Sequence, residues 1–126
     1  MAIKRGKYDL QVYRGDTPTW KMQLFQVDDK TGDKSPIDLS NGFTINAQVR
    51  YNSEANDILY TLPIQIVDAK NGVIKITVPK SASETLLPAG SSLADTAVYD
   101  MQLNIRDSVF TILTGGFSIV RDVTRL

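Results

Sequence analysis

The sequence contains neither cysteine nor histidine among its 126 residues. Without cysteine there can be no disulfide, no thiolate metal site and no cysteine nucleophile. Without histidine there is no imidazole, which is the usual general base and a common metal ligand near neutral pH. Ser-His-Asp and Cys-His catalysis are therefore excluded and a zinc enzyme is disfavoured. These absences predict a protein that is not an enzyme and that uses no metal or cofactor.

An excess of charge and a long apolar run are also missing. The 14 basic residues balance the 14 acidic ones, so there is no basic stripe of the kind that binds nucleic acid. Residues 1–7 are basic, but no apolar segment of signal-peptide or membrane-spanning length follows them. We therefore expect synthesis in the cytoplasm without Sec export, and no nucleic-acid or membrane partner.

What the sequence does contain is alternation of apolar and polar residues with a period of two, clearest in its last quarter. Residues 96–105 alternate in this way, with Tyr99, Met101 and Leu103 on one face. A return strand over 109–120 would add Phe117 to the same core. The Gly115-Gly116 pair inside it predicts a bulge or a close backbone approach, and we expect a kink there.

Five earlier segments have strand patterns as well, at 7–13, 19–27, 43–51, 58–66 and 73–78. Pro63 indicates an edge or a bulge in the fourth of these, and Asn71-Gly72 predicts a hairpin turn before the fifth. Trp20 and Tyr99 should face the core, whereas Tyr13 and Arg50 should face outward.

One helical segment is expected at 81–87. Ser81 with Glu84 has the form of a capping box, and Pro88 and Gly90 end the helix. About seven strands, with this helix between the fifth and the sixth, predict an all-β antiparallel sandwich, with a closed barrel as the alternative. We expect a flexible basic tail over 1–7 and a single domain over 8–126.

Two short motifs suggest binding sites. Arg14-Gly15-Asp16 matches an integrin-binding tripeptide, but a three-residue motif is weak and a tight turn between the first two strands is favoured. Asp28, Asp29 and Asp33 suggest a calcium loop. The EF-hand pattern fails, however, because its closing glutamate position is Leu39, so a solvated loop is favoured.

Scattered carboxylates and aromatic rings are weaker candidates. Five aspartates lie on or near strand ends: Asp38, Asp68, Asp95, Asp100 and Asp107. No two of them are selected as a catalytic pair. Six aromatic residues could form a sugar-binding platform: Tyr8, Tyr13, Trp20, Tyr51, Tyr60 and Tyr99. Packing in and around the core is the favoured explanation for most of them. We therefore predict no catalytic, cofactor-binding or metal-binding residues.

A series of short phrases gives the chain a family resemblance from about residue 8 to residue 125. In order, these phrases are RGDT (14–17), PIDL (36–39), FTINAQVR (43–50), NGVIKI (71–76), SASET (81–85), LPAG (87–90), YDMQL (99–103), GGFSI (115–119) and DVTR (122–125). Their order resembles that of the immunoglobulin-like β-sandwich domains in tailed-bacteriophage virions, such as upper baseplate N-terminal domains and small collar or tail-associated proteins.

The resemblance implies a structural virion component with no catalytic residues. Where similar domains continue into a fibre, this sequence stops at Leu126, which favours a connector, collar or decoration subunit. The expected partners are other virion proteins and further copies of the chain in a symmetric ring. Residues 1–7 and the strand at 58–66 are the expected docking elements. The alternative is a carbohydrate-binding module for the host surface that uses Tyr13, Tyr51 or Tyr60.

Overall fold

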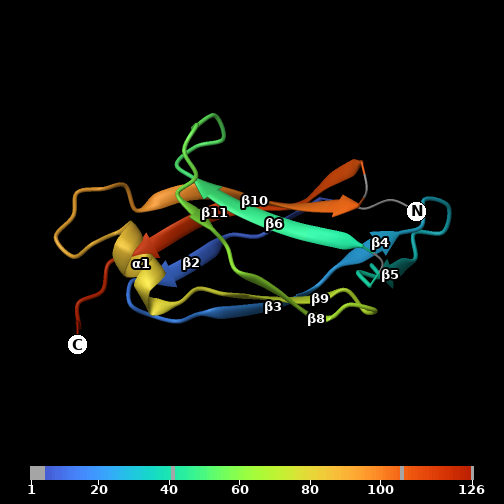
Figure 1. The fold of residues 1–126 in the computed structure, drawn as a ribbon, viewed down its shortest axis with the longest axis horizontal. Coiled ribbons are helices and arrows are strands. Elements are labelled where there is room, and N and C mark those ends of the chain that lie inside the picture. The colour runs from blue at the N-terminus through green and yellow to red at the C-terminus, as the bar shows by residue number, and fades with distance from the viewer. Residues whose placement is uncertain (1–4, 41, 106, 126) are drawn as a thin grey trace.

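The computed structural model describes residues 5–40, 42–105 and 107–125, which form eleven strands and one short helix (Figure 1). In chain order the elements are β1 (Gly6–Lys7), β2 (Leu10–Tyr13), β3 (Thr19–Gln23), β4 (Phe25–Val27), β5 (Lys34–Pro36), β6 (Phe43–Arg50), β7 (Tyr60–Thr61), β8 (Ile64–Asp68), β9 (Val73–Thr77), α1 (Lys80–Leu86), β10 (Thr96–Ile105) and β11 (Ser108–Val120). The all-β class and the single short helix before β10 are confirmed. The count of about seven strands is not.

The strands form three sheets. The largest has six strands in the order β1-β11-β10-β6-β7, with β2 also paired to β11. β1 and β2 run parallel to β11, and the other pairs are antiparallel. The second sheet has the order β3-β9-β8, and β4-β5 is a separate hairpin. In Figure 1 this hairpin lies at one end of the molecule and α1 lies at the other.

The ribbon β10-β11 lies at the centre of the large sheet. Tyr99, Met101 and Leu103 are buried on its inner face, and Phe117 joins them from β11. The register shifts by one residue where Met101 opposes Leu113 and Gln102 opposes Thr111, so Ile112 is the extra residue of a bulge. The irregularity of β11 therefore lies at Ile112 and not at Gly115-Gly116, where a kink was expected.

The two glycines serve a close backbone approach instead. β1 and β2 both pair with β11, and the chain between them, at Tyr8 and Asp9, crosses directly over the glycines. A Cβ atom on Gly115 would lie 2.1 Å from the Tyr8 carbonyl oxygen. The Tyr99 hydroxyl donates a hydrogen bond to this same oxygen, and the Gly116 amide donates one of 2.8 Å to Asp9 Oδ1. At position 115, only glycine leaves room for this crossing.

Tyr99→Phe should cost about 1 kcal/mol of unfolding free energy at pH 7, because the hydrogen bond to Tyr8 is lost. Burial, with smaller contributions from Asp9 and Tyr8, raises the pKa of Tyr99 from 10.0 to about 12. The unfolded chain therefore loses this proton first, and the stability that the neutral phenol contributes is lost as the pH rises from 10 to 12. Denaturant unfolding at pH 7, 10 and 11 should show the gap between wild type and variant narrowing at high pH; a constant gap would contradict this account.

Two of the expected strands are divided because each changes partner along its length. The segment expected at 58–66 first pairs with β6 as β7 and then with β9 as β8, and Leu62 and Pro63 lie between the two. Pro63 thus marks an edge, as predicted. The segment expected at 19–27 divides at Leu24, whose amide donates to Gly72 O and whose carbonyl accepts from the Ile37 amide. The second partner, β5, was missed because its sequence, Lys-Ser-Pro, lacks alternation.

The expected capping box of the helix is wrong. The N-cap residue is Pro79, so Ser81 lies inside the first turn, and no side chain caps the helix. The hairpin turn at Asn71-Gly72 is present, and Gly72 has the positive φ of 67° that such turns require. The tail expected over 1–7 already contains β1. Residues 1–4 of that expected tail, Asn41, Arg106 and Leu126 lie outside the described residues.

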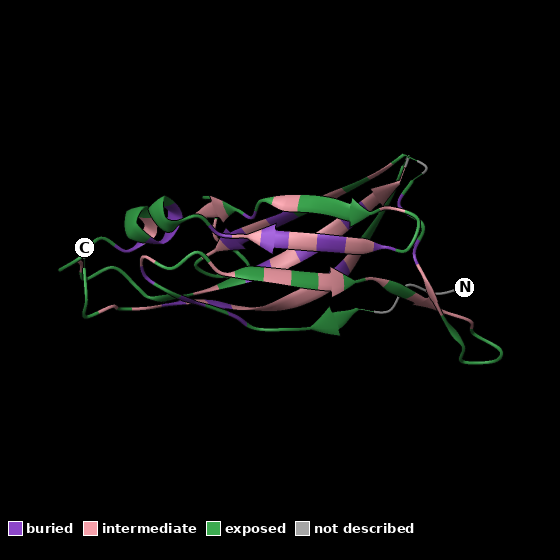
Figure 2. Cartoon of the chain, turned by 90° about the horizontal axis from the view of Figure 1, so that it is seen from below, coloured by how far each residue is buried: buried purple, intermediate pink, exposed green. Residues whose placement is uncertain are grey.

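One core cluster joins residues of both larger sheets. Its fully buried members include Val12, Ile74, Ile76, Val78 and Leu103, and Figure 2 shows buried positions alternating with partly exposed ones along the strands. In β6 and β9, alternate apolar residues lie in this core, among them Ala47, Val49, Ile74 and Ile76. Trp20 packs against this cluster but is only half-buried, because β3 is an edge strand.

Candidate functional site

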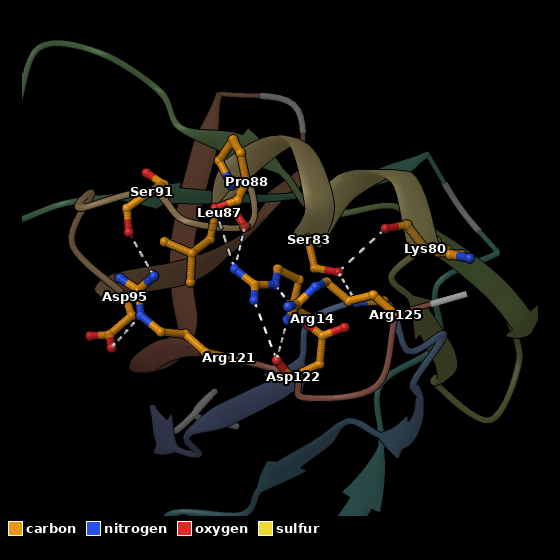
Figure 3. Close-up of polar contacts among 11 residues, drawn as sticks. Arg14, Lys80, Ser83, Leu87, Pro88, Ser91, Asp95, Arg121, Asp122 and Arg125 are labelled. Atoms are coloured by element: carbon orange, nitrogen blue, oxygen red, sulfur yellow. Dashed lines mark hydrogen bonds and ion pairs between the residues drawn. The ribbon is translucent and has the colours of Figure 1, made fainter.

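The Arg14-Gly15-Asp16 motif is a structural junction. Arg14 is only 5% exposed, and its Nε donates a 2.6 Å hydrogen bond to Asp122 Oδ1 (Figure 3). Its Nη1 also donates to the carbonyls of Leu87 and Pro88, at 3.2 and 3.3 Å. Arg14 therefore ties the turn after β2 to the end of α1 and to the C-terminal segment. The tight turn is confirmed by the 2.9 Å bond from the Asp16 amide to Tyr13 O, and the buried guanidinium does not fit an integrin ligand.

A second contact fastens α1 to the same turn. The Gly15 amide donates a 2.9 Å hydrogen bond to Oγ of Ser83, which is fully buried. The Ser83 hydroxyl in turn donates a 3.3 Å hydrogen bond to the Lys80 carbonyl. The Arg14 hydrogen bond lowers the pKa of Asp122 below its ordinary 3.8. The charged groups of this cluster have their hydrogen-bond partners within the fold, so we infer that the cluster stabilises the folded chain.

The predicted carboxylate candidates remain dispersed. Asp38 accepts hydrogen bonds from Ser40, and Asp68 accepts them from Asn71, so each holds a local turn. Asp95 lies 4.0 Å from the Arg121 guanidinium. The suggested calcium loop is closed by Asp28, which accepts from the amides of residues 30 and 31, and these bonds lower its pKa. Within the described ranges, no group of three carboxylates is placed to hold a metal ion.

The aromatic residues do not form one platform. Tyr13 is 54% exposed beside the Arg14 junction, and Tyr51 is exposed at the far end of β6. Tyr60 is half-buried in β7, which raises its pKa. Tyr8 and Trp20 share a surface, in the groove described below. Of the three tyrosines on which the carbohydrate-binding alternative was based, Tyr51 and Tyr60 lie near each other where β6 pairs with β7, whereas β11 and β10 separate Tyr13 of β2 from them.

A polar hollow of about 630 Å³ occupies the outer face of the large sheet. Outward side chains of neighbouring strands line it: Gln102 lies beside Asn46, and Asp100 lies between Gln48 and Thr114. At one end, Arg50 donates to the carbonyls of Ala55 and Asn56, and so holds the loop after β6 against the sheet. The hollow offers amide, carboxylate and hydroxyl groups but no exposed ring.

A groove of about 590 Å³ runs along the opposite edge of the molecule from β7, between β1 and β3. Its floor is apolar and includes Met22, Leu24, Ile112 and Leu113. Four of the described residues that line it are basic, and none is acidic: Arg5, Lys7, Lys21 and Lys34. The sequence does not indicate this site, because the four cations come from three separate segments. They form a cluster only in the folded chain.

The edge strand β8 is also exposed. Its inner neighbours in β9 are buried, but Ile66 and Val67 are 40% and 46% exposed. No hydrogen-bonded strand covers the outer edge of β8 within the described part of the chain. Exposed apolar edge strands pair readily with other chains. β8 overlaps the segment 58–66, which the sequence predicts as a docking element.

None of the described residues belongs to a helix long and apolar enough to cross a membrane. In comparisons with known proteins, no protein-family profile and no curated protein matches this chain.

Proposed function

We propose that the chain is a non-enzymatic structural protein of a tailed-bacteriophage virion. In this role it docks onto tail, baseplate or collar subunits as a connector or decoration protein, with further copies in a symmetric ring. The ordered series of phrases described above supports the virion assignment. The observation that carries the docking role is the apolar, uncovered edge of β8, where Ile66 and Val67 face solvent.

We infer further that the fold is an immunoglobulin-like β-sandwich. In such folds the second, fifth and fourth strands are neighbours in one sheet, and the third, sixth and seventh are neighbours in the other. The orders β3-β9-β8 and β6-β10-β11 support this inference once the divided strands are counted as single ones. β4-β5 would then be an additional hairpin, and the first strand joins β11.

The function is tested by sedimenting purified chain with phage particles that lack it. We expect the wild-type chain to pellet with the particles in a fixed ratio. Val67→Lys should abolish this, because a charge on the edge opposes strand pairing and burial. Thr85→Lys on the exposed face of α1 is the matched control and should bind normally. A wild-type chain that stays in the supernatant would end the proposal.

Glycan binding is a second candidate, favoured by the polar hollow on the large sheet. Amide and carboxylate groups in a shallow depression suit the hydroxyl groups of sugars. Binding on a glycan array that is lost in Gln102→Ala but kept in Asn104→Ala would support it, since Asn104 shares the strand and the face but lies outside the lining. The absence of binding to any glycan would remove this candidate.

A further inference from the structure

The groove between β1 and β3 has the features of a peptide site. We propose that it binds an extended acidic segment of a partner protein, which adds a strand to the free edge of β3. In this segment apolar residues would alternate with aspartate or glutamate. This proposal rests on the proposed structural function: the groove would be one of the docking surfaces, and the acidic segment would belong to the partner bound there.

β3 has a free backbone edge that faces the groove. Among the described strands, β3 pairs with β9 alone. Hydrogen bonds at either end of this pairing involve Pro18 and Leu24, and an antiparallel ladder uses every second residue. The backbone groups of Thr19, Lys21 and Gln23 therefore point away from β9, along the groove. They offer donors and acceptors to an incoming strand.

The floor of the groove is apolar. Tyr8 is 50% exposed and Phe25 is 41% exposed, and both line the groove together with half-buried Trp20. Below them lie Ile112 and Leu113 from β11. Because successive side chains of a strand point to opposite faces, every second residue of the added strand would cover this floor.

The charge of the groove favours an acidic partner. The groove is lined by four cations and by no carboxylate among the described residues, although the whole chain is neutral. Lys21 is exposed on the outer side of the free edge, and Arg5 and Lys7 lie on the opposite wall in and beside β1. An anionic partner gains from all of them, whereas a basic one is repelled. Opposite charge thus selects acidic residues at the outward positions of the bound strand.

The test uses a fluorescein-labelled ten-residue peptide of alternating valine and glutamate, measured by fluorescence anisotropy with the full chain. We expect saturable binding that weakens with added salt, and none for the valine-lysine peptide. Lys21→Pro should abolish binding, because proline removes the outward amide but no ladder bond to β9. Lys21→Gln keeps that amide and should weaken binding by about fivefold, the effect of one exposed ion pair.

Lys80→Glu is the matched control, because it reverses a charge on α1, outside the groove, and should leave the affinity unchanged. Equal binding by Lys21→Pro and wild type would overturn the proposal, as would absence of binding at millimolar peptide. Tighter binding of a single-stranded DNA oligonucleotide would mean a general polyanion site. Dimerisation without peptide that Lys21→Pro abolishes would mean that a second copy covers the edge. Neither result bears on whether the chain sediments with phage particles, so the two proposals can fail separately.

Discussion

Replacing Gly115 by alanine is expected to lower the free energy of unfolding by about 3 kcal/mol. The new methyl carbon would lie 2.1 Å from the Tyr8 carbonyl oxygen and 3.1 Å from the Tyr99 ring. The first of these is a backbone atom and cannot move aside without separating the first strand from β11. The hydrogen bond from Tyr99 to the same oxygen would be disturbed as well. Equilibrium denaturation in urea measures the loss.

Gly116→Ala is the matched control, one residue further along the same strand. Its methyl group would meet Asp9 Oδ1 at 3.5 Å, an ordinary contact, and Gly116 does not have a positive φ. We expect a change within about 0.5 kcal/mol. Equal destabilisation by the two substitutions would contradict the close crossing at Tyr8 and would indicate a general intolerance of side chains in β11.

Removing the buried Arg14 guanidinium should have a similar effect. Arg14→Met keeps much of the side-chain volume but leaves the carbonyls of Leu87 and Pro88 and the Asp122 carboxylate without their donor. We expect a loss of about 3 kcal/mol at pH 7 for this buried side chain. Arg14→Lys should recover only part of it, because an ammonium lacks the planar fork that reaches all three acceptors. Thermal and urea unfolding measure both variants.

The control for Arg14 is Arg125→Met. Arg125 is 55% exposed and lies 4.0 Å from the same Asp122 carboxylate, so its removal should change stability little. A large effect of this control would contradict the assignment of the junction to Arg14.

Lowering the pH gives a second test of the pairing between Arg14 and Asp122. The pKa of Asp122 is lowered in the folded chain, so the stability from its pairing is present above pH 3.8 and is lost as the pH falls through the lowered pKa. The gap between wild type and Arg14→Met should therefore narrow below pH 4. A gap that stays constant down to pH 2 would mean that Asp122 is not the partner that matters.

The strands were predictable where one face meets the core and the other meets water. β10 and β6 followed their alternation closely, because each is central in the large sheet and a shift by one residue would expose its apolar side chains. The divided strands were not predictable in this way. Leu24 and Pro63 lie where the chain exchanges one partner for another, and pairing partners leave no local pattern in the sequence.

The surfaces were less predictable than the strands. The turn at Arg14 was expected, but its partners, Leu87 and Asp122, are more than 70 residues away. The groove of cations arises because β1 pairs with β11 and therefore faces β3 across a gap. Its basic residues are ordinary surface lysines and arginines until the topology brings them together.

We propose above that the chain is a fixed component of a phage particle. A cryo-electron map of intact particles, from a phage whose genome carries this sequence, tests that proposal most directly. We expect density for this β fold at symmetric positions in the tail, baseplate or collar, with the β8 edge or the groove beside β3 against a neighbouring subunit. A map that accounts for every subunit and leaves no place for this chain would contradict the claim.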